Sequence, residues 1–309
     1  MRDFAGRVAV ITGAASGLGR AFAHEAAQRG MRLVLADVQT DALAEVGKEL
    51  RATGCELREQ HCDVAVEEQV HRLAAQACAQ FGPVHLLFNN AGVATGGLAW
   101  EASGRDWQWV LGVNLMGVVH GLQAFVPRML EAATPAHIVN TASVAGLIAP
   151  PNMAVYNVSK HAVVALSETL YHDLRLMQAP IGVTVLCPAF VPTGIHRAER
   201  NRPAHLARER EPTASERAAQ SASEKAVNSG RISAAEVARI TFGAIEEERF
   251  YCLTHPKIMT SVRARCEDLA GCRNPTDPFA HRPELATSLH ASNSSPTDRV
   301  ADLSRSSAP

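Results

Sequence analysis

The stretch Arg7-Val8-Ala9-Val10-Ile11-Thr12-Gly13-Ala14-Ala15-Ser16-Gly17-Leu18-Gly19 decides the fold. Its first half, as far as Thr12, is a short apolar run rich in β-branched residues, which predicts a buried strand of a parallel sheet. Its second half is rich in glycine, and a helical pattern follows it to about Arg29. Glycines at a strand-to-helix turn let the backbone approach a pyrophosphate, and the N–H groups at the start of the helix meet the negative charge. The residues that we expect at such a dinucleotide site are Gly13, Ser16, Gly17, Leu18 and Gly19.

Strands and helices alternate along the chain from this turn. Further strands are predicted at 32–37, 55–62, 84–88, 137–141 and 182–187, and further helices at 40–52, 66–81, 105–130 and 154–177. Strict alternation predicts an α/β fold, a single doubly wound parallel sheet of the Rossmann type with helices on both faces. Ligands of such sheets bind beyond the carboxyl ends of the strands, where each motif described below falls.

The alternation is interrupted after Pro188. Residues 194–232 are dense in Arg, Glu, Ala and Ser, so we expect helical segments that leave the sheet and a substrate lid over about 189–232. A helix at 234–248 and a strand at 250–254 resume the pattern. The composition of 274–309, rich in Pro, Ser, Thr and Asp, predicts a largely disordered tail after a folded domain that spans 1–273.

The bulk properties of the 309 residues indicate a globular protein without a polymeric partner. Hydrophobic residues make up 47% of the chain, and a net charge of -1 gives no field that would attract nucleic acid or an anionic membrane. No secretory signal precedes Val8, and we expect no membrane-spanning segment. Seven cysteines without a C-x-x-C motif predict reduced thiols in a cytoplasmic protein, and the thirteen histidines lack metal-ligand spacing, so no metal site is expected.

Asp37 ends the second predicted strand, 18 residues after Gly19. A carboxylate at this place can accept both ribose hydroxyls of an adenosine and would repel a 2′-phosphate. Because Ala14, Ala15 and Val38 offer no cation to such a phosphate, we expect NAD as the cofactor rather than NADP. The alternative interpretation of Asp37 is a solvated carboxylate or a helix cap.

Two later strand ends add candidate cofactor contacts. Asp63 and Val64 follow the third strand and are candidates to contact the adenine, with a helix N-cap as the alternative role of Asp63. Asn89-Asn90-Ala91-Gly92 follows the fourth strand, and Asn90, Ala91 and Gly92 are small enough to pass close to the cofactor. A plain turn is the alternative there.

Tyr156 is followed four residues later by Lys160 on a predicted helix, and Ser143 lies thirteen residues upstream of the tyrosine. Residues i and i+4 share a helix face, so the ammonium can sit beside the phenol and lower its pKa from the ordinary value of about 10 toward the operating pH. The pairing occurs once, because the other two tyrosines are followed at this spacing by Arg175 and His255. An ordinary exposed pair is the alternative.

Together these motifs resemble those of the classical short-chain dehydrogenase/reductase family over about residues 5–255. The matching positions are Thr12, Gly13, Gly17, Gly19, Asp37, Asp63, Asn89, Asn90, Ala91, Gly92, Asn114, Ser143, Tyr156, Lys160, Pro188, Val191 and Thr193. One departure is Ala189, where the family usually has glycine, and there we expect a stiffer loop rather than a lost site.

The resemblance implies an NAD(P)-dependent oxidoreductase that transfers a hydride between the nicotinamide and a secondary alcohol or ketone. It implies that Tyr156 is the general acid/base, that Lys160 holds the nicotinamide ribose, and that Ser143 hydrogen-bonds the substrate oxygen. Asn114 would bind a helix carbonyl and a water and so extend a proton relay from Lys160, with a buried polar network as its alternative. Pro188, Val191 and Thr193 would wrap the carboxamide and the pyrophosphate.

The expected substrate is a lipophilic small molecule. Loop 144–155 is mostly apolar and, with loop 93–104 and the lid, should form the walls of its site. The segments 112–115, 125–129 and 202–204 are similar to bacterial Cα-dehydrogenases that act on aryl-ether benzylic alcohols, while steroid-type and other secondary alcohols stay open. The arginines of 197–210 alternate with glutamates, which predicts a solvated lid helix rather than an anion site. Packing is expected for Trp100, Trp107 and Trp109, with a place in the cleft wall as the alternative, and Cys187 is expected to be a buried strand residue rather than a nucleophile.

Two other function classes stay open. Nucleotide-sugar epimerases and dehydratases share the Tyr-x3-Lys pair, but they usually carry G-x-x-G-x-x-G and a further sugar-nucleotide domain. A redox sensor that binds the dinucleotide without turnover has no need of Ser143, Tyr156 and Lys160 together. The resemblance also implies a homotetramer or homodimer that packs through the helices at 105–130 and 154–177.

Overall fold

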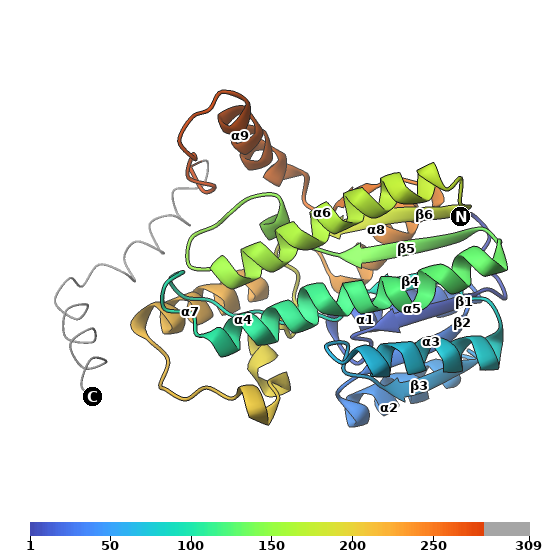
Figure 1. The fold of residues 1–309 in the computed structure, drawn as a ribbon. Helices are drawn as coiled ribbons and strands as arrows, with labels where there is room; N and C mark the ends of the chain where they lie inside the picture. The colour runs from blue at the N-terminus through green and yellow to red at the C-terminus, as the bar shows by residue number, and fades with distance from the viewer. Residues whose placement is uncertain (281–309) are drawn as a thin grey trace.

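The apolar run after Arg7 forms strand β1 (Val8–Thr12), which is an inner strand of a seven-stranded parallel sheet and is buried at every residue (Figure 1). The computed structural model describes residues 1–280. The other strands are β2 (Arg32–Asp37), β3 (Leu57–His61), β4 (Leu86–Asn89), β5 (Ala136–Thr141), β6 (Ile181–Cys187) and β7 (Tyr251–Leu253), and their order in the sheet is β3-β2-β1-β4-β5-β6-β7. The order reverses between β1 and β4, which is the place where doubly wound sheets bind their ligands.

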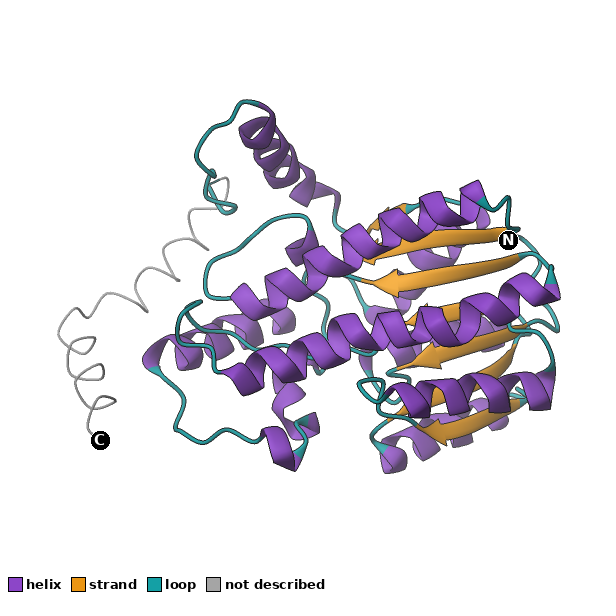
Figure 2. Ribbon diagram, viewed as in Figure 1, coloured by secondary structure: helices purple, strands orange, loops and turns teal. Residues whose placement is uncertain are grey.

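Helices cover both faces of the sheet, as Figure 2 shows. Their bounds are α1 (Gly17–Gln28), α2 (Thr40–Arg51), α3 (Glu67–Phe81), α4 (Gly104–Leu111), α5 (Gly117–Ala132), α6 (Ala154–Leu176), α7 (Ala214–Asn228), α8 (Ala234–Glu246) and α9 (Met259–Ala270). Ala9 and Ile11 of β1 pack with α1, α2 and α8, while Val8 and Val10 pack with α3, α5 and α6. Successive side chains of a strand point to opposite faces, so a run of apolar residues is needed to serve two cores.

The register of the strands brings their carboxyl ends to one edge. Thr12 of β1 lies opposite Ala36 of β2, and Ile11 lies opposite Phe88 of β4. Thr12 then joins the two halves of the sheet, because its hydroxyl donates to the carbonyl of Phe88 and accepts from the backbone N–H groups of Asn90 and Ala91 at 3.1, 2.9 and 3.1 Å. Every predicted strand is present, so the predicted doubly wound architecture is confirmed.

Two elements differ from the prediction. The single helix expected at 105–130 is continuous but contains a π-helical turn, Gly112–Met116, between α4 and α5. Helix α9 was not predicted, although Pro256 just before it and Gly271 just after it are ordinary signals for a helix start and end.

We expected no membrane-spanning segment, and one run of the described residues is nevertheless long and apolar enough to cross a membrane by length and composition alone. The run Gly104–Ala132, with 29 residues, passes such a test, and half of its most apolar window is buried inside the structure. The run is apolar because α5 packs on α3 and on strand β4.

The predicted tail begins within the described part of the chain. Residues 274–280 lie on α9, where the N–H of Thr276 donates to Asp268 at 2.8 Å and the hydroxyl of Ser261 donates to the carbonyl of Pro278 at 2.8 Å. The rest of the predicted tail lies outside the described residues.

Candidate active site

The glycine-rich turn after β1 is shaped by close backbone contact. Gly13 has a φ of +67°, and a Cβ atom at Gly19 would lie 2.0 Å from the carbonyl oxygen of Gly13. Gly19 is itself inside α1, so the turn folds back on the first turn of the helix that it opens. Only glycine permits this approach, which explains the predicted G-x3-G-x-G pattern in steric terms.

The N-terminus of α1 is open to the cavity. Ser16 is the N-cap residue, its side chain makes no capping bond, and the first turn carries no acidic residue. Thr193 of the lid lies against this end, because a Cβ atom at Gly17 would be 3.2 Å from the Cβ atom of Thr193. The first N–H groups of a helix have no partner inside the helix and attract anions, so this end can receive a diphosphate.

Asp37 marks the other end of the cofactor cleft. Its side chain is 7% exposed and accepts hydrogen bonds from the N–H groups of Ala15 and Gln39, both at 2.9 Å. It is therefore neither a solvated carboxylate nor the cap of α2, whose N-cap residue is Gln39. Each carboxylate oxygen keeps lone pairs that can accept a ribose hydroxyl.

Asp63 lines the same cleft without capping a helix. Its carboxylate accepts from the N–H of Ala65 at 2.9 Å, while α3 begins four residues later with Val66 as its N-cap. Asn90 is held by a bond from its amide nitrogen to the carbonyl of Thr12 at 2.9 Å. Both residues line the cavity, Asp63 after β3 and Asn90 after β4.

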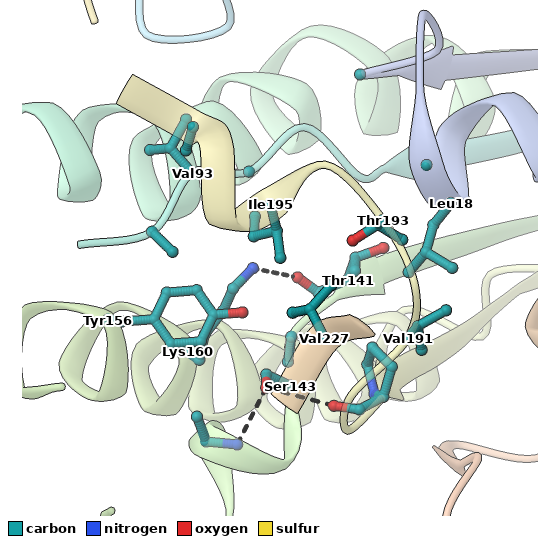
Figure 3. Close-up of a pocket in the computed structure, with 18 of the residues that line it drawn as sticks. Leu18, Val93, Thr141, Ser143, Tyr156, Lys160, Val191, Thr193, Ile195 and Val227 are labelled. Atoms are coloured by element: carbon teal, nitrogen blue, oxygen red, sulfur yellow. Dashed lines mark hydrogen bonds between the residues drawn. The ribbon is translucent and has the colours of Figure 1, made fainter. Parts of the chain in front are cut away.

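Three of the four predicted catalytic side chains, Ser143, Tyr156 and Lys160, converge beside this cleft (Figure 3). Tyr156 and Lys160 come from the start of α6, and the Lys160 ammonium lies 5.7 Å from the centre of the tyrosine ring. That ammonium donates to the carbonyl of Thr141 at 2.8 Å. Ser143 follows β5, and its hydroxyl donates to the carbonyl of Pro188 at 3.3 Å and accepts from the N–H of Ala145 at 3.1 Å.

Burial controls the electrostatics of this group. Burial raises the pKa of Tyr156, and a hydrogen bond with Ser143 opposes that rise in part. Burial also lowers the pKa of Lys160 to about 8. The prediction that the pKa of Tyr156 lies below its ordinary value is therefore wrong for this structure, because a low-dielectric site disfavours the charged form of the phenol.

Asn114 sits in the π-helical turn behind the catalytic residues and is 1% exposed. Its amide nitrogen donates to the carbonyl of Val93 at 2.9 Å and to the hydroxyl of Ser159 at 3.0 Å, and its oxygen accepts from the N–H of Val93 at 2.8 Å. The carbonyl is therefore that of a loop residue after β4, and not a helix carbonyl as expected. Ser159 continues the network to the carbonyl of Tyr156 at 2.7 Å.

One cavity of about 1420 Å³ joins the two halves of the site. It exceeds the roughly 300–1,000 Å³ of a single-ligand pocket, so it has room for a dinucleotide and a second molecule. The predicted residues in its wall are Gly13, Ser16, Gly17, Leu18, Asp37, Asp63, Val64, Asn90, Ala91, Gly92, Ser143, Tyr156, Lys160, Pro188, Val191 and Thr193. Gly19 and Asn114 lie behind that wall, and both support it.

Part of the cavity wall is apolar, and this is the part that the sequence led us to expect around a substrate. The apolar residues of the wall include Val93, Trp109, Ile148, Ile195, Val227 and Phe279. Loop 144–155 and the lid contribute as expected, while loop 93–104 contributes only its first two residues, and Trp100 is 77% exposed outside the wall. Phe279 and the start of α9 belong to the wall of the same cavity, which sequence reasoning missed because no local pattern places residues after β7 there.

The prediction of a solvated lid helix holds only in part: Arg197, Glu199 and Arg200 are exposed, whereas Arg202 and Arg208 turn inward to carboxylate partners. Arg202 and Asp106 form an ion pair at 2.6 Å with side chains only 4% and 5% exposed, and the Arg202 guanidinium stacks 4.2 Å from the centre of a Trp109 ring. Arg208 lies between Glu199 and Glu216, at 3.1 and 3.2 Å. The alternating charges are partners across the lid and onto α4, which a pattern along one segment cannot distinguish from a solvated face.

Cys187 lies at the end of β6 with no exposed surface. Burial raises the pKa of its thiol to about 12, so the thiolate that a nucleophile needs is disfavoured. The expectation of a buried strand cysteine is confirmed. The N–H of Ala189, where glycine was expected, donates to the ring of His255 at 3.3 Å.

The residues of the cleft fit a dinucleotide. An open helix N-terminus, a glycine cradle that a Cβ atom would fill, and a carboxylate at the end of β2 are the three features that such a ligand needs. Among the residues that the structure describes, no group of three His, Cys, Asp or Glu side chains is arranged to hold a metal ion.

Comparisons with known proteins agree with this geometry. A family model for short chain dehydrogenases matches residues 7–204. A dehydrogenase/reductase of CLA biosynthesis from Lactiplantibacillus plantarum is 37% identical over 86% of this chain and 93% of its own length. A C alpha-dehydrogenase from Sphingobium is 37% identical over 66% of this chain and 67% of its own length. A crystal structure of a short chain dehydrogenase/reductase from Burkholderia phymatum in complex with NAD is 57% identical, covers 91% of this chain and 100% of its own, and superposes with a TM-score of 0.89.

Proposed function

Because the chain belongs to the short-chain dehydrogenase family, we propose that it is an NAD-dependent oxidoreductase acting on lipophilic secondary alcohols and ketones. The single observation that carries the proposal is that Tyr156, Ser143 and Lys160 line one cavity with the open N-terminus of α1 and with Asp37. Reacting groups and cofactor-binding groups are therefore close enough to serve one reaction. The structure of the Burkholderia relative with NAD supports the choice of cofactor.

Each residue of the site has a chemical role in this proposal. The bound NAD supplies a nicotinamide ring that exchanges a hydride with the substrate carbon. Gly13, Ser16 and the N-terminus of α1 hold the diphosphate, and Asp37 holds the adenosine ribose. Pro188, Val191 and Thr193 enclose the nicotinamide end. Lys160 holds the ribose of the nicotinamide. The Thr141 carbonyl, which accepts a hydrogen bond from the Lys160 ammonium, orients that ammonium.

Tyr156 moves the proton. In ketone reduction its hydroxyl gives a proton to the substrate oxygen while the substrate carbon gains a hydride, and in alcohol oxidation its phenolate takes that proton back. Ser143 donates a hydrogen bond to the same oxygen and holds it beside the phenol. Because burial raises the pKa of Tyr156, the protonated form that reduction needs predominates at neutral pH, and oxidation gains from alkaline pH.

Asn114 and Ser159 position the tyrosine. Their network fixes the first turn of α6 through the carbonyl of Tyr156 and ties it to the loop after β4 through Val93. We propose that Asn114 also binds a water that extends a proton relay from Lys160, as the family resemblance implies. The two bonds of its amide to the backbone of Val93 would hold it in the orientation for this role.

The substrate class follows from the walls of the cavity. Trp109, Ile148 and Val227 offer apolar contact, and similarity to the Sphingobium C alpha-dehydrogenase supports an aryl-bearing secondary alcohol among the candidates. A nucleotide-sugar epimerase usually carries G-x-x-G-x-x-G, whereas the turn after β1 has Gly13-x3-Gly17-x-Gly19. We further propose that the protein works in the cytoplasm.

The test is a screen of NADH fluorescence with secondary alcohols and ketones of graded size, run in parallel with NAD and NADP. We expect turnover with NAD that improves with apolar substrate size until the cavity is full. Binding of NADH without turnover of any alcohol or ketone would favour a redox sensor instead.

A further inference from the structure

Arg200 is a lid residue that lines the cavity and contacts the opposite side of the cofactor cleft. It lies in the 3-10 helix Ile195–Asn201, it lines the large cavity, and its Nε atom donates to the side-chain oxygen of Gln39 at 3.2 Å. Gln39 comes two residues after Asp37, from the opposite side of the cleft. The contact joins residues 161 positions apart in sequence and spans the cleft mouth.

The guanidinium is also close to the place where the diphosphate binds. Gly17, in the first turn of α1, lies against Thr193, as described above. The next residue is Gly194, whose carbonyl accepts from Nη1 of Arg200 at 3.1 Å, and a Cβ atom there would lie 3.3 Å from Nη2. The cation therefore sits one residue away from the contact between the lid and the anion-binding end of α1.

Arg200 differs in its partners from the three arginines that follow it in the lid. Arg202, Arg208 and Arg210 each have a carboxylate within ion-pair distance, whereas Arg200 has none among residues 1–280. Among the same residues, Arg197, Arg217 and Arg231 also lack a carboxylate within ion-pair distance, and Arg231 also lines the cavity. Its three bonds go to neutral oxygens, those of Gln39, Gly194 and Arg197. A guanidinium that faces a concave wall without a counterion is suited to a phosphate.

The partner of Arg200 across the cleft is itself held in place. The backbone N–H of Gln39 donates to the carboxylate of Asp37 at 2.9 Å. The side chain of Gln39 makes no capping bond at the start of α2, so its amide is available to the lid. A line of contacts thus runs from Asp37 through Gln39 to Arg200 and on to Gly194.

We propose that Arg200 is a cofactor-binding residue: its guanidinium binds the diphosphate of the dinucleotide, and its bond to Gln39 holds the lid across the cleft. The inference rests on the proposed use of NAD and does not depend on the alcohol chemistry. The lid then has two attachments, Arg202 on the substrate wall and Arg200 on the cofactor. The simpler role that competes with this one is a cap of the 3-10 helix through Gly194 and Arg197.

The test is the affinity of the full chain for NADH, measured by the change in nicotinamide fluorescence, in the wild type and in Arg200→Gln. We expect Arg200→Gln to lower the affinity for NADH about tenfold, because a charged hydrogen bond to phosphate is lost. Arg197→Gln is the matched control, since Arg197 is an exposed arginine of the same 3-10 helix outside the cavity wall. It should leave the affinity unchanged.

Further ligands and variants identify which part of the dinucleotide is bound. ADP-ribose, which has the diphosphate, should lose as much affinity as NADH in Arg200→Gln, and adenosine, which lacks it, should lose none. Arg200→Lys should retain most of the affinity. Gln39→Ala should speed NADH release, and its effect should not add to that of Arg200→Gln, because the two residues act through one contact.

Several results would overturn the inference. If Arg200→Gln binds NADH as tightly as the wild type, or if its affinity for adenosine falls as much as its affinity for NADH, Arg200 is only a cap of the 3-10 helix. A loss confined to NADPH would reassign it to a 2′-phosphate. Failure of the wild type to bind NADH would instead reject the proposed cofactor, so the two failures are distinguishable.

Discussion

The buried charge of Lys160 lowers the free energy of unfolding and makes it depend on pH. Its side chain is 3% exposed, and burial lowers its pKa from 10.5 to about 8. The unfolded chain therefore binds more protons than the folded one between pH 8 and 10.5, so the stability of the protein rises with pH across this window. Below it the cost of the buried ammonium is fully present.

The prediction is that Lys160→Met stabilises the fold at pH 7 while it abolishes turnover. The shift corresponds to about 3 kcal/mol, and the lost bond to Thr141 offsets about 1 kcal/mol of it, which leaves a gain of about 2 kcal/mol in the free energy of unfolding. Denaturant unfolding at pH 7 and at pH 10.5 measures this, and the gain should vanish at the higher pH. A variant that is less stable at pH 7 would show that the ammonium is not destabilising.

Gly19 is required by contact rather than by flexibility. A Cβ atom there would overlap the carbonyl of Gly13, so Gly19→Ala must displace the turn. We expect this variant to lower the affinity for NADH at least about tenfold and the free energy of unfolding by about 1–3 kcal/mol. Gly243→Ala in α8 is the matched control, because a Cβ atom there meets nothing within 4 Å. It should raise the stability by up to about 1 kcal/mol through helix propensity. Equal effects of the two changes, by thermal unfolding and NADH titration, would contradict this account.

At the scale of elements, the lid depends on a buried ion pair. Burial acts to raise the pKa of Asp106, but hydrogen bonds from Ser103 and Arg202 hold it below its ordinary value. Removal of one partner leaves a buried charge without compensation, which typically costs about 3–5 kcal/mol. The pair also fixes Trp109, which stands in the substrate wall.

Arg202→Met should therefore destabilise the protein by about 3 kcal/mol and raise KM for the ketone, with the affinity for NADH little changed. Adding Asp106→Asn should recover part of the stability, since the unpaired carboxylate is then neutral. The control is Arg239→Met on α8, whose ion pair with Glu236 is exposed, with 63% and 38% of the two side chains accessible, and which should cost less than about 1 kcal/mol. If both single variants behave alike, the lid is not anchored by this pair.

The bounds of a helix or strand could be predicted where residues within it or next to it determine them. The apolar run before Gly13 and the closing Gly30 define β1 and α1 within a residue, and Tyr156 and Lys160 share a face because of helical geometry alone. The π-helical turn around Asn114 has no such signal, because it depends on the bonds of Asn114 to Val93 and Ser159.

At the scale of the molecule, sequence order predicted the sheet but not every wall of the site. Strand ends gather at one edge by topology, so Asp37, Asn90 and Ser143 could be placed together from the chain alone. Phe279 and Arg200 could not, since their positions follow from how α9 and the lid fold back. The acidity of Tyr156 was mispredicted for the same reason: neighbours in sequence do not give the burial of a site.

The whole molecule is expected to be a homodimer or homotetramer. Met116 and Val158 are 40% and 48% exposed, and the π-helical turn that carries Met116 packs against α6, which carries Val158. Light scattering at micromolar concentration should give a dimer or tetramer, and Val158→Glu should give a smaller species. Leu269→Glu, at a residue 64% exposed on α9, is the control and should leave the assembly intact. A monomeric wild type would contradict the expectation.

The most direct test of the central claim is a single-turnover reaction of bound NADH with a ketone, in the wild type and in Tyr156→Phe, from pH 6 to pH 10. We predict that Tyr156→Phe binds NADH within about twofold of the wild type, yet oxidises it at least about a thousandfold more slowly at every pH, because the proton donor alone is missing. In the wild type the rate of reduction should stay level through neutral pH, as the raised pKa of Tyr156 requires. A Tyr156→Phe protein that oxidises NADH at a rate near that of the wild type would contradict the account.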